Sequence, residues 1–244
     1  MTTLGFRHLR LLLVSLVLLA LIAPTARATS KELLPGLDQV GTYGYLTQPD
    51  FTGLALVESI ASGNTIGIGT FENLDGELVM VGGDVFQIRP DGVPRAPEPF
   101  TTTPFMQAIF FAPRIHVPVP PGTTCQELPT LITDAAQRED GIIAVRVRGT
   151  FTDLVTRSVS ADPPPFQPLS TTIAEQTVFP LGEQRAVLVG FWQGKSALGV
   201  GQDGLHLHGL TANRSAGGHV LSCVAGPDIQ LSVQPVDSVS LLTR

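Results

Sequence analysis

The sequence predicts an α+β fold that is rich in strands, with mixed or antiparallel sheets and a few short helices, and two related subdomains are one interpretation of its organisation. Short β-rich runs recur between glycine-bearing turns, whereas apolar residues at helical spacing are confined to brief segments. Strands and helices do not alternate regularly, as a doubly wound parallel sheet requires. The composition, 43% hydrophobic with 25 Gly and 20 Pro, is typical of a globular protein with many strands and turns.

The first half of the chain predicts one short helix and a meander of strands. Apolar residues over 52–62 fall mostly at helical spacing, and a Gly-Asn step at 63–64 ends the helix. The next segment alternates β-rich runs with glycine turns, which is the pattern of an antiparallel sheet. We expect its strands at residues 66–71, 77–81 and 84–88.

The second half predicts further strands and two helices. Residues 124–138 can form a helix, and residues 141–156 one or two strands. Three consecutive prolines at 163–165 cannot lie in a central strand, so we place a soft domain boundary there. The elements expected after it are a short helix at 170–176, a strand at 186–192 and a final hairpin with trailing strands.

The expected organisation is an N-terminal α+β domain over residues 29–160 and a C-terminal β-rich domain over residues 161–244. The glycine-rich hairpin at 67–86 loosely resembles the one at 204–224. An ancient duplication would explain this similarity, and it would make the two subdomains relatives.

The N-terminus has the order of a secretory signal peptide. Arg7 and Arg10 precede an uncharged apolar run of 13 residues, 11–23, and then a small-residue triplet at 26–28. Because a helix needs about 20 apolar residues to span a bilayer, a permanent membrane anchor is the weaker alternative. We expect residues 1–28 to be a signal peptide and the protein to be exported, periplasmic or secreted, with no membrane contact after cleavage.

Charge and cysteine content restrict the possible partners. Without residues 1–28 the chain has 12 Lys and Arg against 21 Asp and Glu, a formal charge of −9. Nucleic acid is therefore an unexpected partner, since binding phosphates requires clustered basic charge. The cysteines are Cys125 and Cys223, and in an oxidising compartment they could be bridged or could remain two buried thiols. Their spacing leaves both alternatives open.

Three histidines, His206, His208 and His219, fall within 14 residues. On a strand, side chains two residues apart share a face, and the turn at 213–218 can bring the third histidine back from a neighbouring strand. Three neutral nitrogen ligands are typical of a catalytic zinc site, which keeps a position open for water or substrate. The alternative is a set of core or surface histidines without metal. The spacing favours a Zn²⁺ site in the C-terminal domain.

Other histidine patterns are less consistent with the sequence. A cupin metal site normally has a Glu shortly after the His-x-His pair, and residues 209–215 contain none. Nothing else in the chain indicates a carbonic anhydrase. His116, between Ile115 and Val117, has no such companions, and we interpret it as structural.

Further motifs lie in a fixed order along the chain. They are at 67–78, 86–87, 91–92, 103–105, 146–151, 156–159, 189–191, 205–208 and 217–220. Over roughly residues 50–225, their order and spacing resemble bacterial alpha-acetolactate decarboxylases. A resemblance of this length is not expected by chance.

The resemblance implies a zinc-dependent decarboxylation of 2-acetolactate to acetoin. It implies that the three histidines are the zinc ligands and that Glu77 is an active-site carboxylate and candidate proton donor. Arg157 would face the substrate carboxylate, Thr70 would line the pocket, and the protein would be a homodimer.

The sequence also departs from that family. Its members usually have a second active-site glutamate in a C-terminal tail, and we find no obvious equivalent up to Arg244. Asn213 stands where an acidic residue is usual, and Gly209 replaces a bulkier one. Two alternatives are therefore an enzyme for another 2-hydroxy-3-keto acid and an exported zinc-binding protein without catalysis.

Overall fold

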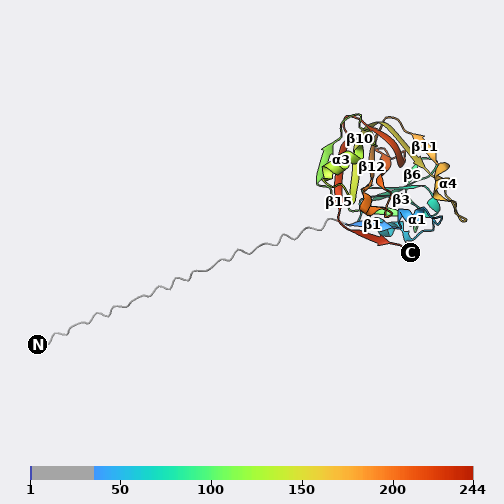
Figure 1. The fold of residues 1–244 in the computed structure, drawn as a ribbon, viewed down its shortest axis with the longest axis horizontal. Helices are drawn as coiled ribbons and strands as arrows, with labels where there is room; N and C mark the ends of the chain where they lie inside the picture. Colours follow the sequence, from blue (N-terminus) through green and yellow to red (C-terminus); the bar gives the residue numbers. More distant parts are fainter. Residues whose placement is uncertain (2–35, 244) are drawn as a thin grey trace. The chain divides into compact units, whose positions relative to one another are not determined.

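A computed structural model describes Met1 and residues 36–243, and the fold of this part is shown in Figure 1. The predicted signal peptide lies outside the described residues, apart from Met1. Within the described part, no helix combines the length and the apolar character needed to cross a membrane. The described residues from 36 to 243 belong to one compact unit.

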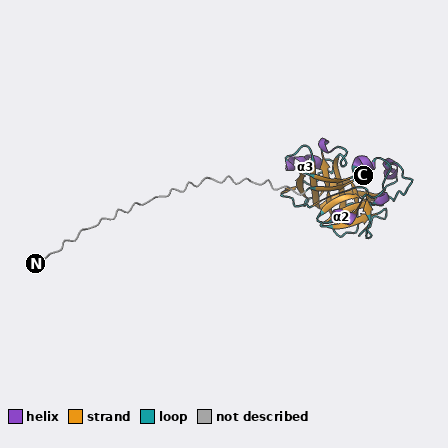
Figure 2. Cartoon of the chain, turned by 90° about the horizontal axis from the view of Figure 1, so that it is seen from below, coloured by secondary structure: helices purple, strands orange, loops and turns teal. Residues whose placement is uncertain are grey.

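Two seven-stranded sheets dominate the fold, as the strand-rich prediction requires (Figure 2). The first has the order β16-β1-β8-β3-β4-β5-β6, and its one parallel pair is β1 with β16. Its strands are β1 (Leu37–Val40), β3 (Ile66–Thr70), β4 (Glu77–Val81), β5 (Asp84–Ile88), β6 (Pro94–Arg95), β8 (Met106–Ile109) and β16 (Val239–Leu242). The predicted antiparallel meander is thus confirmed as β3, β4 and β5.

The second sheet is built around one long strand, β10 (Ile142–Ser158). Its other members are β9 (Ile115–Pro118), β11 (Thr177–Pro180), β12 (Gln184–Gln193), β13 (Gly204–Thr211), β14 (Gly217–Ala225) and β15 (Gln230–Val236). Because β10 pairs with both β12 and β14, and β13 joins those two, the four strands close into a ring. The register of β10 against β14 shifts twice, and such bulges help a long strand to bend.

The helices and remaining strands are short. The helices are α1 (Tyr43–Leu46), α2 (Val57–Ala61), α3 (Leu128–Ala136) and α4 (Leu169–Ala174), with 3-10 turns at Glu72–Leu74 and Lys195–Ala197. A separate ribbon pairs β2 (Ala55–Leu56) with β7 (Thr102–Thr103). The helix predicted over 52–62 was therefore too long: Leu56 is extended and bonded to β7, so the helix starts only at Val57.

One buried core lies between the two sheets. Ile68 and Val79 of the first sheet pack in one buried cluster with Ala144, Val189 and Phe191 of the second. Burial of such side chains stabilises the fold by about 1.5–3 kcal/mol for each large residue. The sheets therefore form a sandwich, and a site that lies between them is partly shielded from water.

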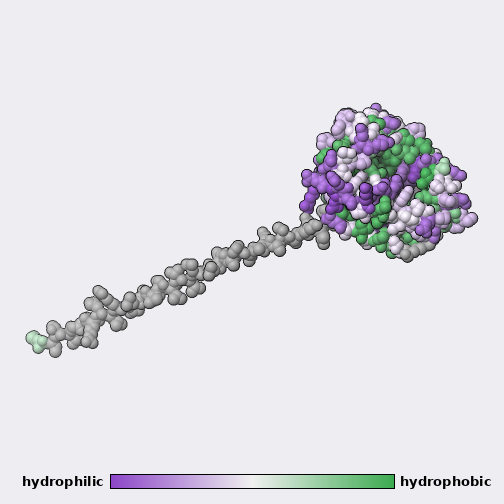
Figure 3. Space-filling model, viewed as in Figure 1, coloured by the Kyte–Doolittle hydropathy of each residue, from purple (hydrophilic) through white to green (hydrophobic). Residues whose placement is uncertain are grey.

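The outer faces of the sheets have their own clusters. Leu128 and Ile132 of α3 pack with Leu231 on the second sheet, and Val57 of α2 packs with Met80 on the first. Figure 3 shows polar and apolar side chains interspersed over the face of the folded unit that it presents. The short helices thus cover sheet faces that would otherwise expose a continuous apolar surface.

A disulfide is present, whereas the predicted domain boundary stays a prediction. Cys125 and Cys223 are bridged, with Cα atoms 5.1 Å apart, so the disulfide alternative holds. The strand β10 lies before the predicted boundary near residue 160 but pairs with four strands that lie beyond it. Separate domains over 29–160 and 161–244 stay a prediction, as does a duplication of the two glycine-rich hairpins.

Candidate metal centre and cavity

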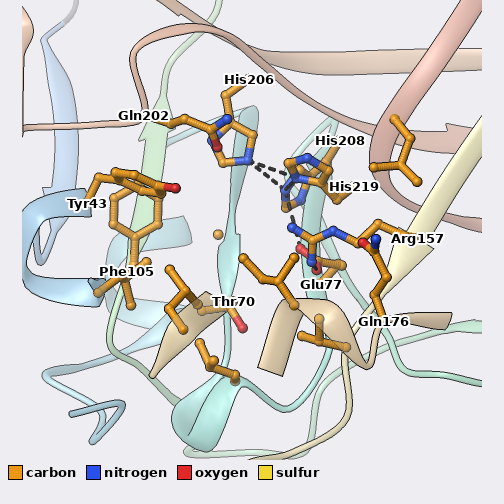
Figure 4. Close-up of a pocket in the computed structure, with 17 residues that line it drawn as sticks. Tyr43, Thr70, Glu77, Phe105, Arg157, Gln176, Gln202, His206, His208 and His219 are labelled. Carbon is orange, nitrogen blue, oxygen red and sulfur yellow. Dashed lines mark hydrogen bonds and ion pairs between the residues drawn. The ribbon is translucent and has the colours of Figure 1, made fainter. Parts of the chain in front are cut away.

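The three histidines meet at one point between the sheets. His206 and His208 lie on one face of β13, and His219 is the register partner of His208 on β14. The Nε2 atoms of His206 and His208 are 3.1 Å apart, and His219 Nδ1 lies 3.2 Å and 3.3 Å from them. Figure 4 shows the three rings pointing toward one another. This group could hold a metal ion.

The orientation of His208 is fixed by the opposite sheet. Its Nδ1 lies 2.7 Å from the backbone oxygen of Leu78 on β4. A carbonyl oxygen only accepts, so Nδ1 carries the proton and Nε2 presents its lone pair to the other two rings. Such a hydrogen bond to the second nitrogen is the usual support for a metal-binding histidine.

Burial keeps the histidines neutral. His206 and His208 are buried, and desolvation followed by the charge of Arg157 lowers the pKa of His206 to about 3. The pKa of His208 lies well below its ordinary value because of burial and then His206, and that of His219 because of burial and then Arg157. Neutral imidazole is the form that binds metal ions, so the unprotonated cluster is ready to coordinate.

Glycines let the backbone pack closely around these strands. Gly190 of β12 lies directly against the carbonyl oxygen of His206, where a Cβ atom would overlap it. Gly218, with φ of 128°, allows β14 to approach the carbonyl oxygen of Arg157. Both close approaches occur next to the histidines, and they set the distance between the strands that carry them.

Glu77 and Arg157 lie beside the histidine cluster and form an ion pair with each other. Glu77 is the first residue of β4, and its Oε1 binds Arg157 Nη1 from β10. Its other oxygen, Oε2, is 3.4 Å from His208 Nε2. Desolvation raises the pKa of Glu77, and the neighbouring guanidinium opposes that shift. The pair therefore places a buried carboxyl group between a cation and the nitrogen cluster.

Thr70 also lines the cavity, but its hydroxyl does not point toward the histidines as Glu77 and Arg157 do. It ends β3 as the register partner of Glu77, and its hydroxyl donates to the backbone oxygen of Gly76 at 2.8 Å. Figure 4 shows this hydroxyl directed away from the histidines. The hydroxyl therefore secures the turn before Glu77.

The cavity next to these residues has a volume of about 290 Å³. Besides the predicted residues, its polar lining includes Tyr43, Gln176 and Gln202. The rest of the lining is largely apolar: Leu46, Leu74, Phe105, Val159, Leu169, Ile173 and Leu221. Most of these residues lie in α1, α4 or loops, where the sequence carries no periodic signal. His116 does not line this cavity, and its Nδ1 is 2.9 Å from Ser232 Oγ on β15.

Comparisons with known proteins identify a family for this chain. The model of the family described as alpha-acetolactate decarboxylase matches residues 37–243. An alpha-acetolactate decarboxylase from Methanosarcina mazei is 33% identical over 76% of this chain and 64% of its own length. One from Klebsiella aerogenes is 30% identical over 70% of this chain and 66% of its own length, so the chain spans slightly less than two thirds of either relative.

Solved structures match the fold as well. The crystal structure of alpha-acetolactate decarboxylase from Bacillus subtilis strain 168 has a TM-score of 0.81 to this chain at 27% identity. The match covers 85% of this chain and 88% of the other. From the family match over residues 37–243, the chain belongs to the alpha-acetolactate decarboxylase family.

Proposed function

We propose that this chain is a zinc-dependent decarboxylase that converts 2-acetolactate to acetoin. The observation that carries the proposal is the triangle of three histidine nitrogens facing a cavity that also holds Glu77 and Arg157. The family membership supports the same reaction.

Zinc fits the nitrogen triangle. In a tetrahedral site with bonds of about 2.0–2.1 Å, two nitrogen ligands lie roughly 3.3–3.4 Å apart. The three separations here are 3.1, 3.2 and 3.3 Å. Hydrogen bonds among the three rings satisfy these nitrogens poorly, because His208 Nε2 has a lone pair and no proton, and each neutral imidazole has only one N–H. His206, His208 and His219 would therefore hold the ion, and a bound zinc would act as a Lewis acid for negative charge on substrate oxygens.

Arg157 is suited to orient the substrate carboxylate. Its Nη1 is bound to Glu77, and among the described residues no side chain accepts a hydrogen bond from its Nη2. A guanidinium can bind a second carboxylate through its remaining planar donors. The group would hold the substrate while the bond to its carboxylate carbon breaks and carbon dioxide leaves.

Glu77 is the candidate proton donor. After carbon dioxide has left, the electron pair of the broken bond remains on the substrate, and one proton must be delivered to that carbon. Burial raises the pKa of Glu77, which favours a protonated carboxyl at a pH where an exposed glutamate is ionised. As carbon dioxide departs, Arg157 loses its anionic ligand and remains a partner for the carboxylate that Glu77 becomes.

Turnover of acetolactate by the purified protein tests this function. We expect acetoin to form from racemic 2-acetolactate, to stop after chelator treatment and to return with added Zn²⁺. Turnover that persists after complete metal removal would contradict the proposal. Turnover of only another 2-hydroxy-3-keto acid would support the alternative substrate, and zinc binding without any turnover would support a non-catalytic protein.

We also propose that the protein is exported and forms a homodimer. The Cys125–Cys223 disulfide supports an oxidising compartment, because cytosolic thiols are normally kept reduced. Fractionation of the native host would locate the protein, and light scattering of the purified chain would give its mass. A reduced cytosolic protein would contradict export, and the mass of one chain would contradict the dimer.

A further inference from the structure

We infer that the hydroxyl of Tyr43 is a second polar contact to the substrate, made from the wall of the cavity opposite Glu77 and Arg157. This inference rests on the proposed function, since it concerns how a small oxygenated acid is held in the same cavity. It adds to the reaction a residue that neither the histidine spacing nor the motif at Glu77 indicates.

Tyr43 and Gln202 form a polar pair of residues on their own side of the cavity. Figure 4 shows the Tyr43 hydroxyl directed into the cavity, with Gln202 close to His206 and with Glu77 and Arg157 on the other side. All four residues line the same space of about 290 Å³. A small oxygenated acid held in that space would have polar side chains of the protein on two sides.

The Tyr43 hydroxyl has capacity for a ligand. Among the described residues, no group forms a hydrogen bond with it, although the side chain is half-buried. Leu46 and Phe105 also line the cavity, so much of the lining near Tyr43 is apolar. A hydroxyl that faces an apolar space gains most when a ligand oxygen enters, because water is then displaced and the hydrogen bond is strengthened.

The backbone that carries Tyr43 is held firmly. Thr42 caps α1, its side chain accepting from Tyr45 N at 3.1 Å. The backbone N–H of Tyr43 donates to Val200 O at 3.0 Å, and that of Gly44 to Gly199 O at 3.2 Å. The helix α1 and the loop that leads to Gln202 are thus joined by backbone hydrogen bonds and form one wall.

A buried chain of glutamines anchors this wall to the sheet core. Gln193 donates to Gln107, and Gln107 donates to Gln39, at 3.3 and 2.8 Å. Gln39 then donates to Val200 O at 2.5 Å and to Gly41 O at 2.9 Å. The three glutamines are at most 1% exposed. Because buried amides are costly unless hydrogen-bonded, such a chain fixes a specific geometry, here that of the segments before and beside Tyr43.

The chemistry indicates which part of the substrate Tyr43 would contact. The phenol donates one hydrogen bond and can accept another, so it suits a hydroxyl or carbonyl oxygen. The carboxylate is better served by Arg157 on the other wall. Tyr43 would therefore contact an oxygen of the 2-hydroxy-3-keto portion, and it would favour substrates that carry both oxygens.

Tyr43→Phe tests this role, with Tyr45→Phe as the matched control on the same helix. Loss of one hydrogen bond to a substrate oxygen that gains charge should lower kcat/KM for acetolactate roughly 10- to 100-fold. Zinc content and the thermal unfolding midpoint of Tyr43→Phe should match those of the wild type. Tyr45→Phe should retain wild-type kcat/KM, because Tyr45 does not line the cavity.

A second measurement tests the contribution of the hydroxyl to ligand binding apart from turnover. The stable analogue 2,3-dihydroxy-2-methylbutanoate, whose ketone is reduced so that carbon dioxide cannot leave, should bind the zinc-loaded Tyr43→Phe protein more weakly than the wild type in calorimetry. Wild-type kcat/KM in Tyr43→Phe, or a loss that occurs equally in Tyr45→Phe, would overturn the inference. A wild-type protein without turnover of acetolactate would contradict the proposed function, and the role of Tyr43 with it.

Discussion

The two hairpins that meet at the cavity contribute in different ways. The hairpin of β13 and β14 supplies all three histidines, which converge within 3.3 Å of one another. The hairpin of β3 and β4 supplies the Glu77 carboxyl and the Leu78 carbonyl, which hold Arg157 and His208 respectively. The first hairpin alone supplies the three nitrogens that could bind a metal ion. The second hairpin lies in the facing sheet and supplies the groups that orient His208 and Arg157.

This difference separates metal binding from turnover. If the assignment is right, changes on β13 and β14 should remove the metal, and changes on β4 should leave the metal in place while slowing the reaction. Each prediction below tests that separation, beginning with the largest expected effect.

His208→Ala should abolish zinc binding and acetoin formation together. The ring of this residue is fixed by the backbone oxygen of Leu78, and its Nε2 lies within 3.3 Å of a ring nitrogen of each other histidine. The loss should exceed the roughly 10- to 100-fold cost of removing a supporting group around a metal. Metal analysis and initial rates on the same sample measure both effects. His116→Ala is the control, and full activity in His208→Ala would remove the metal assignment.

Glu77→Gln should keep zinc and slow turnover by about 10²- to 10⁴-fold, the range for loss of a general acid. The substitution preserves shape and removes the ionisable proton beside Arg157. Zinc content and kcat are the measurements, and Glu58→Gln on the exposed face of α2 is the matched control. A Glu77→Gln protein that is also free of zinc would mean that Glu77 supports the metal site instead.

The sequence predicted the longer strands and the histidine group because their signals are local. The alternation of β-rich runs and turns defined β3, β4 and β5, and the His-x-His spacing needed only one strand. The predicted helix over 52–62 was too long because Leu56 pairs with the distant Thr102. One strand or two over 141–156 stayed open, since the continuity of β10 depends on partners far along the chain.

The wall of the cavity that contains Tyr43 could not be predicted. The helix α1 is only four residues long, so it has no periodicity to detect. Its position depends on the hydrogen bond between Gln39 and Val200, which are 161 residues apart in the sequence. Glu77 and Arg157 were found only through the family resemblance, because an isolated acidic and an isolated basic residue carry no spacing signal.

Close packing behind the histidine strands gives a prediction about stability. Gly190→Ala should lower the free energy of unfolding by about 1–3 kcal/mol or more, since the new Cβ would overlap the carbonyl oxygen of His206. Gly209→Ala should cost less, because its Cβ would meet the flexible Leu188 Cδ2 at 2.8 Å. Urea unfolding of both variants measures the difference. Equal losses would mean that strand spacing at His206 is less constrained than the geometry requires.

The smallest effect concerns the pH dependence of the stability of the metal-free protein. Acidification should lower the stability contributed by His206 on one hairpin and raise the stability contributed by Glu77 on the other. The pKa of His206 is lowered from 6.5 to about 3 in the folded chain, so between these values the unfolded chain binds more protons. Stability from His206 is therefore complete above about pH 6.5 and is lost as the pH falls toward 3. The pKa of Glu77 is raised from 4.5, so its folded form binds more protons just above that value and gains stability as the pH falls.

Urea midpoints of chelator-treated protein between pH 8 and pH 4 test this opposition. His206→Gln should flatten the decline in stability on acidification, since it removes the group whose protonation favours unfolding. Glu77→Gln should steepen the decline, since it removes the group whose protonation favours folding. If both site variants changed the slope in the same direction, burial would not be the common cause of the two pKa shifts. The predicted electrostatic difference between the two hairpins would then be wrong.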